Sequence, residues 1–414
     1  MKLLFICLDY YPYSGPCTNI LKNLFSSYFE EYRNGEVEVH VLTIVNSISD
    51  SRYEVSDGVI IHRILIEELV PKWHLKKLLR QSPRIGLLIL FHRIIFIIWK
   101  RLHQEEFLNP ITTRKIIKGL ADIPDDIDAV IPVAAHFGTV DAALKNREEQ
   151  KDKLPKIIVM MMDPCSTSRF ASKKTYGARY SLESKMLEEA DSILALNTTY
   201  DELIDLYPAN DTKNVFRFEV PNVRQLPFID TIRKHESEIV CAYVGGLDRK
   251  VRDPNYILEV FSRLKQGVQL YLIGVNEYDI PLKYRDCSNI MCLGKKTIDE
   301  THVFLGQADF LINIGNNSLN QIPSKLFEYI SQGKPIINSC KSTECPTIPY
   351  MERYPLSLNV FETDGVETTI NKVSAFIEEN IGKSIPFGVV ETIYAECTPK
   401  YVCKQIIDLV KKPV

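Results

Sequence analysis

The residues best suited to chemistry lie within residues 320–335, in the second half of the chain. A polar loop leads into a short helix that we expect to open at Pro323, Ser324 and Lys325. The N-terminus of a helix carries unpaired N–H groups and about half a positive charge, which suits a phosphate. Lys325 adds a full positive charge, and Glu328 lies on the same helical face, where it could accept hydrogen bonds from two sugar hydroxyls. The stretch predicts a site for a nucleotide with its diphosphate, with a capped helix and a surface lysine as the alternative.

A second group of candidate ligands follows the strand expected at Ile239–Val244. Gly245 and Gly246 come directly after this strand, and glycines let the backbone approach a ligand closely. Three basic residues that could neutralise a diphosphate follow within four positions, at Arg249, Lys250 and Arg252. Paired glycines are also typical of an ordinary turn. The prediction therefore depends on this loop reaching the same cleft as Lys325 and Glu328.

Three candidates in the first half of the chain also follow expected strands. Gly15 lies between the opening strand and a helix, where its N–H could reach the far side of the same diphosphate, although a plain loop explains it equally well. His136 and Asp163 come just after buried strands, and the carboxyl ends of parallel strands supply the residues of a cleft. A single histidine is also often structural, so both interpretations of His136 stay open.

The elements that must position these residues alternate between strand and helix patterns. Such alternation is typical of parallel sheets with helical crossovers. A first run of strands is expected at residues 2–8, 37–45, 59–64, 129–133, 157–162, 193–196 and 216–220, and a second run at residues 239–244, 269–273, 290–292, 310–314, 335–338 and 356–359. Residues 221–227 between the runs form a candidate hinge. We therefore predict an α/β protein with two doubly wound, Rossmann-like domains that face each other across a cleft.

Composition narrows the classes of function. The chain has 414 residues, enough for two to three domains, and its net charge of −3 gives no reason to expect a nucleic-acid partner. Ten cysteines occur without a Cys-x-x-Cys pair, which favours reduced thiols in a cytoplasmic protein. The apolar start of the chain is broken at Asp9 and resembles a buried strand more than a signal peptide.

Several phosphate and metal motifs are absent from the sequence. It contains neither a Gly-x-x-x-x-Gly-Lys-Ser/Thr loop nor Gly-x-Gly-x-x-Gly, which weakens the case for a kinase, an ATPase or a dehydrogenase. Its one Asp-x-Asp element, Asp126-Ile127-Asp128, precedes a strand and so is poorly placed to hold a metal at a cleft. We expect a diphosphate site without a metal, built from basic residues and helix ends.

One segment, residues 72–118, departs from the alternating pattern. It contains eleven Lys or Arg residues against two acidic ones, Glu105 and Glu106. Within it, residues 85–99 are almost wholly apolar, interrupted by His92 and Arg93, and are too short to span a bilayer. An apolar helix with basic flanks suits the surface of an anionic membrane. The alternative is a helix of the core or of a dimer interface.

Residues 239–338 resemble the donor-binding half of the retaining nucleotide-sugar glycosyltransferases of the GT-B fold. The likeness is to the family 4-like group that builds bacterial polysaccharides and the cell envelope. The resembling motifs are the Gly-Gly-Leu turn at 245–247 with its basic cluster, the run Pro-Ser-Lys-Leu-Phe-Glu-Tyr at 323–329, and Gly-Lys-Pro at 333–335. More loosely, the first half resembles the acceptor-side domain through Tyr11-Pro12, Gly15 and His136. Cys397-Thr398-Pro399 resembles the start of the helix that crosses back to that domain.

The resemblance implies a domain division and roles for individual residues. The acceptor-side domain would span residues 1–222, the donor-side domain 223–396 and the closing helix 397–414. Glu328 would bind the ribose, while Arg252 or Lys250 together with Lys325 would stabilise the departing diphosphate. His136 would lie near the transferred sugar, and attack on the face of the leaving group would retain the anomeric configuration. The family usually has a second glutamate eight positions before the ribose-binding one, where this chain has Asn320.

The expected donor-binding residues are Gly15, Gly245, Gly246, Lys250, Asn320, Pro323, Ser324 and Glu328, with Asp163 as a candidate on the acceptor side. We expect a glycosyltransferase at the cytoplasmic face of the membrane. It would move a sugar from a nucleotide-diphosphate sugar to a lipid-linked or glycan acceptor, without a metal or another cofactor. The alternative is a catalytically silent GT-B partner of another glycosyltransferase, which Asn320 and the basic segment 72–118 motivate.

Overall fold

The computed structural model describes residues 1–10, 16–31, 36–45, 47, 50–105, 107–149, 155–167, 172–209, 211–226, 238–247, 249, 251–318 and 321–413. Its internal contacts divide the chain into two compact units. Unit 1 comprises Met1–Pro221 and Pro399–Val414, and unit 2 comprises Asn222–Thr398. Three of the predicted site residues, Gly15, Lys250 and Asn320, lie outside the described residues.

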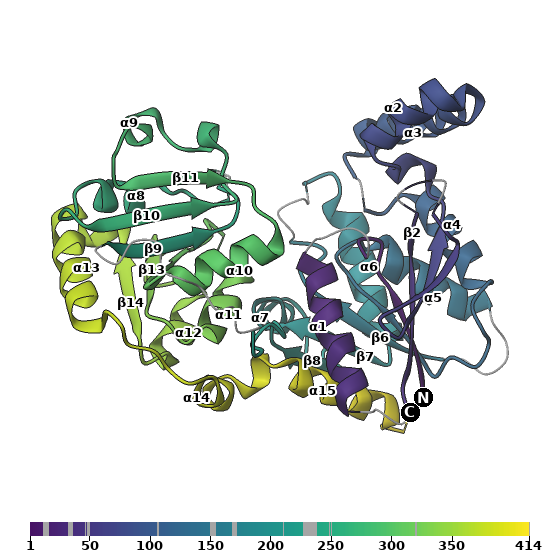
Figure 1. The fold of residues 1–414 in the computed structure, drawn as a ribbon. Coiled ribbons are helices and arrows are strands. Elements are labelled where there is room, and N and C mark those ends of the chain that lie inside the picture. Colours follow the sequence, from purple (N-terminus) through teal and green to yellow (C-terminus); the bar gives the residue numbers. More distant parts are fainter. Residues whose placement is uncertain are drawn as a thin grey trace. The chain divides into compact units, whose positions relative to one another are not determined.

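In the described part of unit 1, eight strands form one sheet in the order β3-β4-β2-β1-β5-β6-β7-β8 (Figure 1). The strands are β1 (Lys2–Ile6), β2 (Glu38–Ile44), β3 (Tyr53–Ser56), β4 (Val59–Ile64), β5 (Ala129–Pro132), β6 (Lys156–Met161), β7 (Ser192–Leu196) and β8 (Val215–Phe218). The helices are α1 (Pro16–Glu31), α2 (Lys72–Gln81), α3 (Pro83–His103), α4 (Pro110–Leu120), α5 (Gly138–Glu149), α6 (Tyr176–Glu189), α7 (Asn197–Leu206) and α15 (Pro399–Lys411), with a 3-10 turn, η1, at Glu67–Leu69.

The central strands of unit 1 are continuous apolar runs because helices cover the sheet. Residues 3–6 of β1 are at most 2 % exposed, as in parallel sheets buried on both faces. Strand β3 was not predicted from the sequence, and it pairs antiparallel with β4. The turn between them, Asp57-Gly58, has positive φ at both residues, which is the geometry of a tight hairpin.

The six described strands of unit 2 follow the order β11-β10-β9-β12-β13-β14, and every pair is parallel. The strands are β9 (Ile239–Val244), β10 (Val268–Ile273), β11 (Ile290–Gly294), β12 (Phe310–Ile314), β13 (Ile336–Cys340) and β14 (Ser357–Phe361). The helices are α8 (Asn255–Ser262), α9 (Leu282–Arg285), α10 (Ile298–Gln307), α11 (Lys325–Ser331), α12 (Ile348–Arg353), α13 (Val366–Asn380) and α14 (Phe387–Ile393), with 3-10 turns η2 (Glu277–Asp279), η3 (Glu362–Asp364) and η4 (Ala395–Cys397). The prediction of two doubly wound α/β domains is confirmed.

Three asparagines cross the sheet of unit 2 side by side; Asn313 and Asn338 are buried and Asn359 is half-buried. Asn313 on β12 donates to Asn338 on β13 at 2.7 Å, and Asn338 donates to Asn359 on β14 at 2.8 Å. The register places the three residues opposite one another. Asn338 is fully buried, and its amide also contacts the hydroxyl of Thr347 at 3.0 Å. The ladder satisfies polar groups that would otherwise be costly to bury, and so it fixes the register of these strands.

Each sheet changes its direction of winding at one point. In unit 2 this switch point lies between β9 and β12, and in unit 1 it lies between β1 and β5. Loops leave the carboxyl ends of such neighbouring strands in opposite directions and open a crevice in which α/β proteins bind ligands. The loops after β9 and β12 carry residues 245–252 and 315–324, and β5 leads to His136. The topology therefore directs most of the predicted site residues to one of two switch points.

The last helix of the chain, α15, packs against unit 1. Its buried residues recur at helical spacing, at Val402, Cys403, Ile406, Ile407 and Val410. The Cys403 thiol donates to the carbonyl of Leu24 in α1 at 3.2 Å. The ammonium of Lys156 donates to the carbonyl of Val410 at 2.8 Å, near the end of α15 where carbonyls lack helical partners. The chain thus returns from unit 2 to unit 1 before it ends.

Candidate functional site

The loop after β9 approaches its surroundings so closely that it needs glycine. Gly245 has φ of +146°, and a side chain there would lie 3.2 Å from the hydroxyl of Tyr243 and 3.6 Å from the guanidinium of Arg252. Its N–H donates to the carbonyl of Ile273 at the end of β10, at 2.9 Å. The structure therefore leaves the space in front of β9 open, bordered by backbone and by a guanidinium group.

Arg252 is held across the switch point of unit 2. Its Nη1 donates to the hydroxyl of Tyr243 at 2.9 Å, and its Nε and Nη2 donate to Oδ1 of Asn316 at 3.2 and 2.8 Å. Tyr243 is the fifth residue of β9, and Asn316 lies two residues after β12. Asn316 in turn donates to the carbonyl of Gln321 at 3.1 Å. The guanidinium is thus fixed by both strands that border the crevice.

Sequence reasoning did not identify Tyr243 and Asn316, the residues that orient Arg252. Tyr243 is 2 % exposed, and its hydroxyl donates to the carbonyl of Gly246 at 3.0 Å. Both residues come from strand ends at a switch point, and that position was the signal available in the sequence. Tyr243 lies nine residues before Arg252 but Asn316 lies 64 residues after it, so their joint role required the fold.

Tyr329 ties the helix α11 to the end of β9. Its hydroxyl accepts from the N–H of Val244 at 2.7 Å and donates to the carbonyl of the same residue at 3.3 Å. Burial raises the pKa of Tyr329, so the hydroxyl stays neutral and fills both roles. The helix begins at Lys325 with Ser324 as its N-cap residue in helical conformation and without a side-chain capping bond. Pro323 precedes them and accepts from the N–H of Leu326 at 3.0 Å.

Lys325 and Glu328 form an ion pair on the first turn of α11. The ammonium and a carboxylate oxygen are 2.6 Å apart, and the side chains are 35 % and 16 % exposed. Lys325 also lines a pocket of about 230 Å³ together with Gly245 and Gly246. The structure therefore gathers Gly245, Gly246, Arg252, Lys325 and Glu328 at the carboxyl ends of β9 and β12. Such a site offers two cations and one carboxylate to a ligand that carries both phosphate and hydroxyl groups.

His302 is a further residue of this pocket that sequence reasoning missed. It lies on α10, and the pocket lining also includes Lys296 and Thr301. Burial lowers the pKa of His302, the Glu328 carboxylate raises it, and the charges of Arg224 and Lys325 lower it further. The imidazole is therefore neutral at pH 7 and lies within the electrostatic reach of the Lys325–Glu328 pair. A single histidine in an amphipathic helix gave no signal in the sequence.

The Gly-Lys-Pro motif at 333–335 has a structural role. Gly333 has φ of +68°, and a side chain there would collide with the carbonyl of Ile385. Lys334 donates from its ammonium to the carbonyls of Leu305, Gly306 and Ala308, at 2.8, 2.6 and 2.6 Å. A lysine that satisfies the last carbonyls of a helix stabilises its C-terminus. The motif thus supports α10, which carries His302.

In unit 1, His136 lies four residues beyond β5 and packs against an aromatic ring. The ring centroids of His136 and Phe107 are 5.4 Å apart in an edge-on arrangement. A side chain at Gly138 would lie 3.1 Å from the imidazole, and the carbonyl of His136 accepts from Thr139 at the start of α5. The imidazole is half-buried at the switch point of unit 1. Its place fits a role in a crevice as well as a role in loop packing.

Asp163 follows β6 and lies near the start of α1. Burial, together with the carboxylates of Asp9 and Asp163, raises the pKa of Cys17 to about 12. The three groups therefore lie within electrostatic reach at the carboxyl ends of β1 and β6. The structure describes Asp163 in the same unit as His136, whereas Arg252, Lys325 and Glu328 belong to unit 2.

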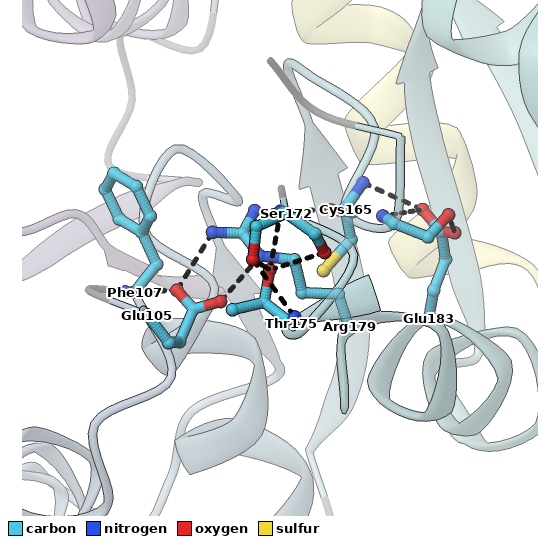
Figure 2. Close-up of polar contacts among 8 residues, drawn as sticks. Glu105, Phe107, Cys165, Ser172, Thr175, Arg179 and Glu183 are labelled. Atoms are coloured by element: carbon cyan, nitrogen blue, oxygen red, sulfur yellow. Dashed lines mark hydrogen bonds and ion pairs between the residues drawn. The ribbon is translucent and has the colours of Figure 1, made fainter. Parts of the chain in front are cut away.

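A buried ion pair between Arg179 and Glu105 lies next to Phe107, whose ring packs against His136 (Figure 2). Arg179 on α6 donates from Nε and Nη2 to the two carboxylate oxygens of Glu105, at 2.6 and 2.9 Å, and the two side chains are 1 % and 5 % exposed. The guanidinium lies 5.6 Å from the centre of the Phe107 ring. The carboxylate of Glu105 also accepts from the N–H of Phe107 at 2.8 Å. The pair thus positions the ring that packs against His136.

A second buried carboxylate, Glu183, holds the loop after β6. One of its oxygens accepts from the N–H of Cys165 at 2.8 Å, and the other accepts from the hydroxyl of Tyr207 at 2.9 Å (Figure 2 shows the contact with Cys165). The hydroxyl of Ser166 donates to it as well. Arg179 reaches the same loop through the carbonyl of Cys165 at 3.3 Å. Sequence reasoning missed this network because its members are spread over residues 105–207.

Two acidic clusters of unit 1 are already occupied by lysines. Among the described residues, Glu67, Glu68 and His92 are close enough to share a metal ion, but Lys115 lies 2.6 Å from both carboxylates. Asp126 pairs with the ammonium of Lys2 at 2.7 Å, and Asp128 accepts the N–H of the same residue at 2.8 Å. That contact lies at the start of β1, at the edge of the sheet opposite the carboxyl ends of the strands.

Comparison with solved structures places this geometry in a known fold. The fold is GT-B. Sucrose-phosphate synthase from Thermosynechococcus elongatus superposes with a TM-score of 0.65 at 12 % identity, over 99 % of this chain and 98 % of the other. The catalytic domain of starch synthase IV from Arabidopsis thaliana, bound to ADP and acarbose, gives 0.62 at 9 % identity, over 99 % and 98 %. The lipopolysaccharide outer core galactosyltransferase WaaB in its apo form gives 0.58 at 12 %, over 99 % of both chains.

Sequence comparison adds nothing to this likeness. No family model matches the sequence, and no curated protein is similar to it in sequence. The likeness to solved structures thus rests on the fold over almost the whole length of the chain.

Proposed function

We propose that this protein is a glycosyltransferase that uses a nucleotide-diphosphate sugar as its donor. The observation that carries the proposal is the cationic crevice at the switch point of unit 2, where Arg252 is fixed by Tyr243 and Asn316 and faces the open loop of Gly245. Solved structures with the same fold include one bound to ADP and acarbose and one in complex with UDP and glucose. A diphosphate with sugars on both sides is the kind of ligand that suits this crevice.

The charged residues of the crevice have two roles in the proposed reaction. A nucleotide diphosphate gains negative charge as the sugar departs, and Arg252 and Lys325 stabilise that charge where it develops. Glu328 receives the ribose hydroxyls on its carboxylate. The ion pair between Lys325 and Glu328 holds both side chains on one turn of α11 before the donor arrives. Preformed geometry of this kind avoids reorganisation during the reaction.

The finer features of the reaction follow the family 4-like resemblance. We propose transfer with retention, catalysed without a metal, to a lipid-linked or glycan acceptor. Metal independence is motivated by Arg252 and Lys325, which could supply the countercharge that a metal ion would otherwise give the diphosphate. A lipid-linked acceptor would be met at the cytoplasmic face of a membrane, so the enzyme would need a surface that binds lipid.

Donor hydrolysis tests this proposal. The purified protein is incubated with UDP-, GDP- and ADP-sugars, and release of the nucleotide diphosphate is measured. Lys325→Ala and Glu328→Ala should each abolish turnover while circular dichroism shows an intact fold, and the exposed neighbours Lys295→Ala and Glu352→Ala serve as controls. Full activity of both site variants would disprove the assignment of the crevice.

A catalytically silent partner of another glycosyltransferase is the second candidate. It is motivated by Asn320, which replaces the usual glutamate of the family, and by the basic apolar segment 72–118. Calorimetry with UDP, GDP and ADP separates the two candidates. Micromolar binding that is lost in Arg252→Ala favours the enzyme, and no binding of any nucleotide diphosphate favours the silent partner.

A further inference from the structure

Helices α2 and α3 form a hairpin that stands away from the sheet of unit 1 (Figure 1). A small cluster of its own holds it together, with Val70, Leu75, Leu78 and Ile89 buried. The helices meet so closely at Gly86 that a side chain there would lie 2.8 Å from the backbone nitrogen of Leu79. The hairpin is therefore a small packed element whose outer faces do not contribute to a hydrophobic core.

Apolar side chains form a stripe along the outside of α3. Leu87, Phe91, Ile94, Ile98 and Leu102 recur every three or four residues, so they share one face of the helix. Each is between 47 % and 62 % exposed. Single exposed apolar residues are common, but a continuous stripe of large ones marks an interaction surface. No described helix of the protein is both long and apolar enough to cross a bilayer.

The hairpin is also strongly basic. Residues 72–104 contain eight Lys or Arg residues and no Asp or Glu, although the whole chain has a net charge of −3. The outer face of α2 carries Lys72, Lys76, Lys77 and Arg80, together with Trp73, which is 62 % exposed. The surface therefore combines cations and an amphipathic indole on one helix with an apolar stripe on the next.

Both ends of the hairpin are fixed to unit 1. Arg93 donates to the carbonyl of Val70 at 2.7 Å, next to the 3-10 turn η1. At the other end, Glu105 follows α3 by two residues and forms the buried pair with Arg179. This pair also positions Phe107, whose ring packs against His136. The hairpin is thus held at a defined position on the same unit that carries His136.

We propose that the α2–α3 hairpin binds the surface of an anionic membrane and lies in the headgroup region. Basic residues attract anionic lipids, at about 1 kcal/mol for each Lys or Arg near the surface. An apolar helical face can bury about 5–10 Å into the boundary with the acyl chains. A second copy of this chain would bring two sets of eight positive residues together, which Coulomb repulsion opposes.

A hairpin bound to the membrane surface would bring the enzyme to the lipid-linked acceptor of the proposed function. In that respect the proposal rests on the proposed function, but binding to lipid needs neither donor nor turnover. The vesicle-binding test and the donor-hydrolysis test can therefore have different outcomes. A protein that hydrolyses donors but ignores vesicles contradicts this inference alone, and one that binds vesicles but hydrolyses no donor contradicts the proposed function alone.

The test is flotation of the full-length protein with vesicles. One set is made of phosphatidylcholine alone, and the other of equal parts of phosphatidylcholine and phosphatidylglycerol. The protein should float with the second set at low salt, remain unbound with the first, and be released as salt shortens the range of the attraction. Absence from the anionic vesicles at low salt, or equal binding to both sets, would overturn the proposal.

Charge-matched variants locate the surface. Lys76→Glu, Lys77→Glu and Arg80→Glu together should weaken binding to the anionic vesicles by at least about 10²-fold. The control replaces Lys213, Lys383 and Lys404, three exposed lysines outside the hairpin, with Glu, and it should bind nearly as well as the wild type. Equal weakening in both variants would mean that net charge alone drives binding and that the hairpin is not the contact.

A second pair of variants tests whether the apolar stripe enters the lipid. Phe91→Ser with Ile98→Ser should weaken vesicle binding about 10-fold or more, because two large side chains no longer enter the lipid. Tyr278→Ser with Leu282→Ser, which are 85 % and 76 % exposed in unit 2, is the control. Thermal melting confirms that each variant folds. A stripe variant that binds like the wild type contradicts insertion of this face.

The tryptophans give a readout that needs no substitution. The chain has two, Trp73 on α2 and Trp99 on α3, so tryptophan fluorescence, excited selectively over that of the 20 tyrosines, reports on the hairpin alone. Anionic vesicles should shift the emission to shorter wavelength and protect it from aqueous quenchers. An unchanged spectrum would contradict the proposal, and light scattering that shows a dimer separated by Phe91→Ser with Ile98→Ser would assign the surface to a contact between copies.

Discussion

The two switch points use charged residues in opposite ways. In unit 2, Arg252, Lys325 and Glu328 lie partly exposed at the mouth of the crevice, where neutral partners such as Asn316 hold Arg252 and Lys325 pairs with Glu328. In unit 1, Arg179 and Glu105 are buried beneath the surface, and the crevice shows a histidine against an aromatic ring. Charges at the mouth can meet a charged ligand, whereas buried charges can only hold other residues in place. The cations at the mouth in unit 2 suit a diphosphate, whereas the carboxyl ends of β1 and β6 in unit 1 carry the carboxylates of Asp9 and Asp163.

The largest expected effect concerns the buried pair of unit 1. Arg179→Met should lower the free energy of unfolding of this unit by about 3–5 kcal/mol, because it leaves the Glu105 carboxylate buried without a partner. Urea denaturation followed by far-ultraviolet circular dichroism measures the loss. Replacing both partners, Glu105→Leu with Arg179→Met, should recover most of it. Removal of an exposed partner, Arg263→Met beside Glu367, should cost less than about 1 kcal/mol.

For Arg252 we expect the opposite result, a large loss of activity with little change in stability. Arg252→Ala should reduce turnover of the donor by about 10²–10³-fold, because one group that stabilises the leaving diphosphate is lost. Its stability should change little, because the guanidinium is partly exposed. Arg263→Ala, exposed and also in unit 2, is the control and should keep turnover within a few-fold of the wild type. A variant that loses stability and activity together would remove the contrast between the two switch points.

The asparagine ladder of unit 2 gives an intermediate effect on stability. Asn338→Ala should cost about 1–3 kcal/mol, because the amides of Asn313 and Asn359 each lose a buried partner. Asn359→Ala, at the less buried end of the ladder, should cost less. Chemical denaturation measures both. If the two substitutions cost the same, the ladder does not stabilise the strands as a connected network.

The smallest expected effect is the pH dependence of donor binding through His302. Burial lowers the pKa of His302 in the free protein, and a bound diphosphate should raise it. The protonated form then binds more tightly, so affinity should rise a few-fold as the pH falls from the bound-state pKa to the free-state pKa. Calorimetry with a nucleotide diphosphate between pH 8 and about pH 5.5 measures this. Subtracting the profile of His302→Gln removes the titration of the ligand itself, and identical profiles would place the phosphates away from His302.

The same pKa shift has a consequence for stability with the opposite sign. Because the folded-state pKa of His302 is lowered, the unfolded chain binds more protons below its ordinary pKa. The contribution of this residue to stability is therefore present above that pKa and decreases as the pH falls. His302→Gln should flatten this part of the stability profile in chemical denaturation.

Much of unit 2 could be predicted from local sequence. The order of strands and helices gave two doubly wound α/β domains. The paired glycines were identified because they directly follow a strand, and Lys325 and Glu328 because they lie on the first turn of a helix that follows a polar loop. Whether these residues bind a donor stays a prediction. Strand β3 was missed although its Asp-Gly turn is in the sequence, because four residues at the edge of a sheet give little alternation. Asn316 and His302 were missed because their roles depend on residues far along the chain, and Tyr243 was missed because a tyrosine inside an apolar strand is typical of the hydrophobic core.

The sequence by itself determined the local elements, the loops that need glycine and the charge of each segment, because these depend on neighbours a few residues apart. Only the tertiary structure decided which loops share a switch point, that Lys334 caps α10, and that Glu105 is buried against Arg179. It also decided that the apolar residues of α3 split into a packed side and an exposed stripe. These features arise from contacts between residues distant in sequence, and such contacts are fixed only when the chain packs.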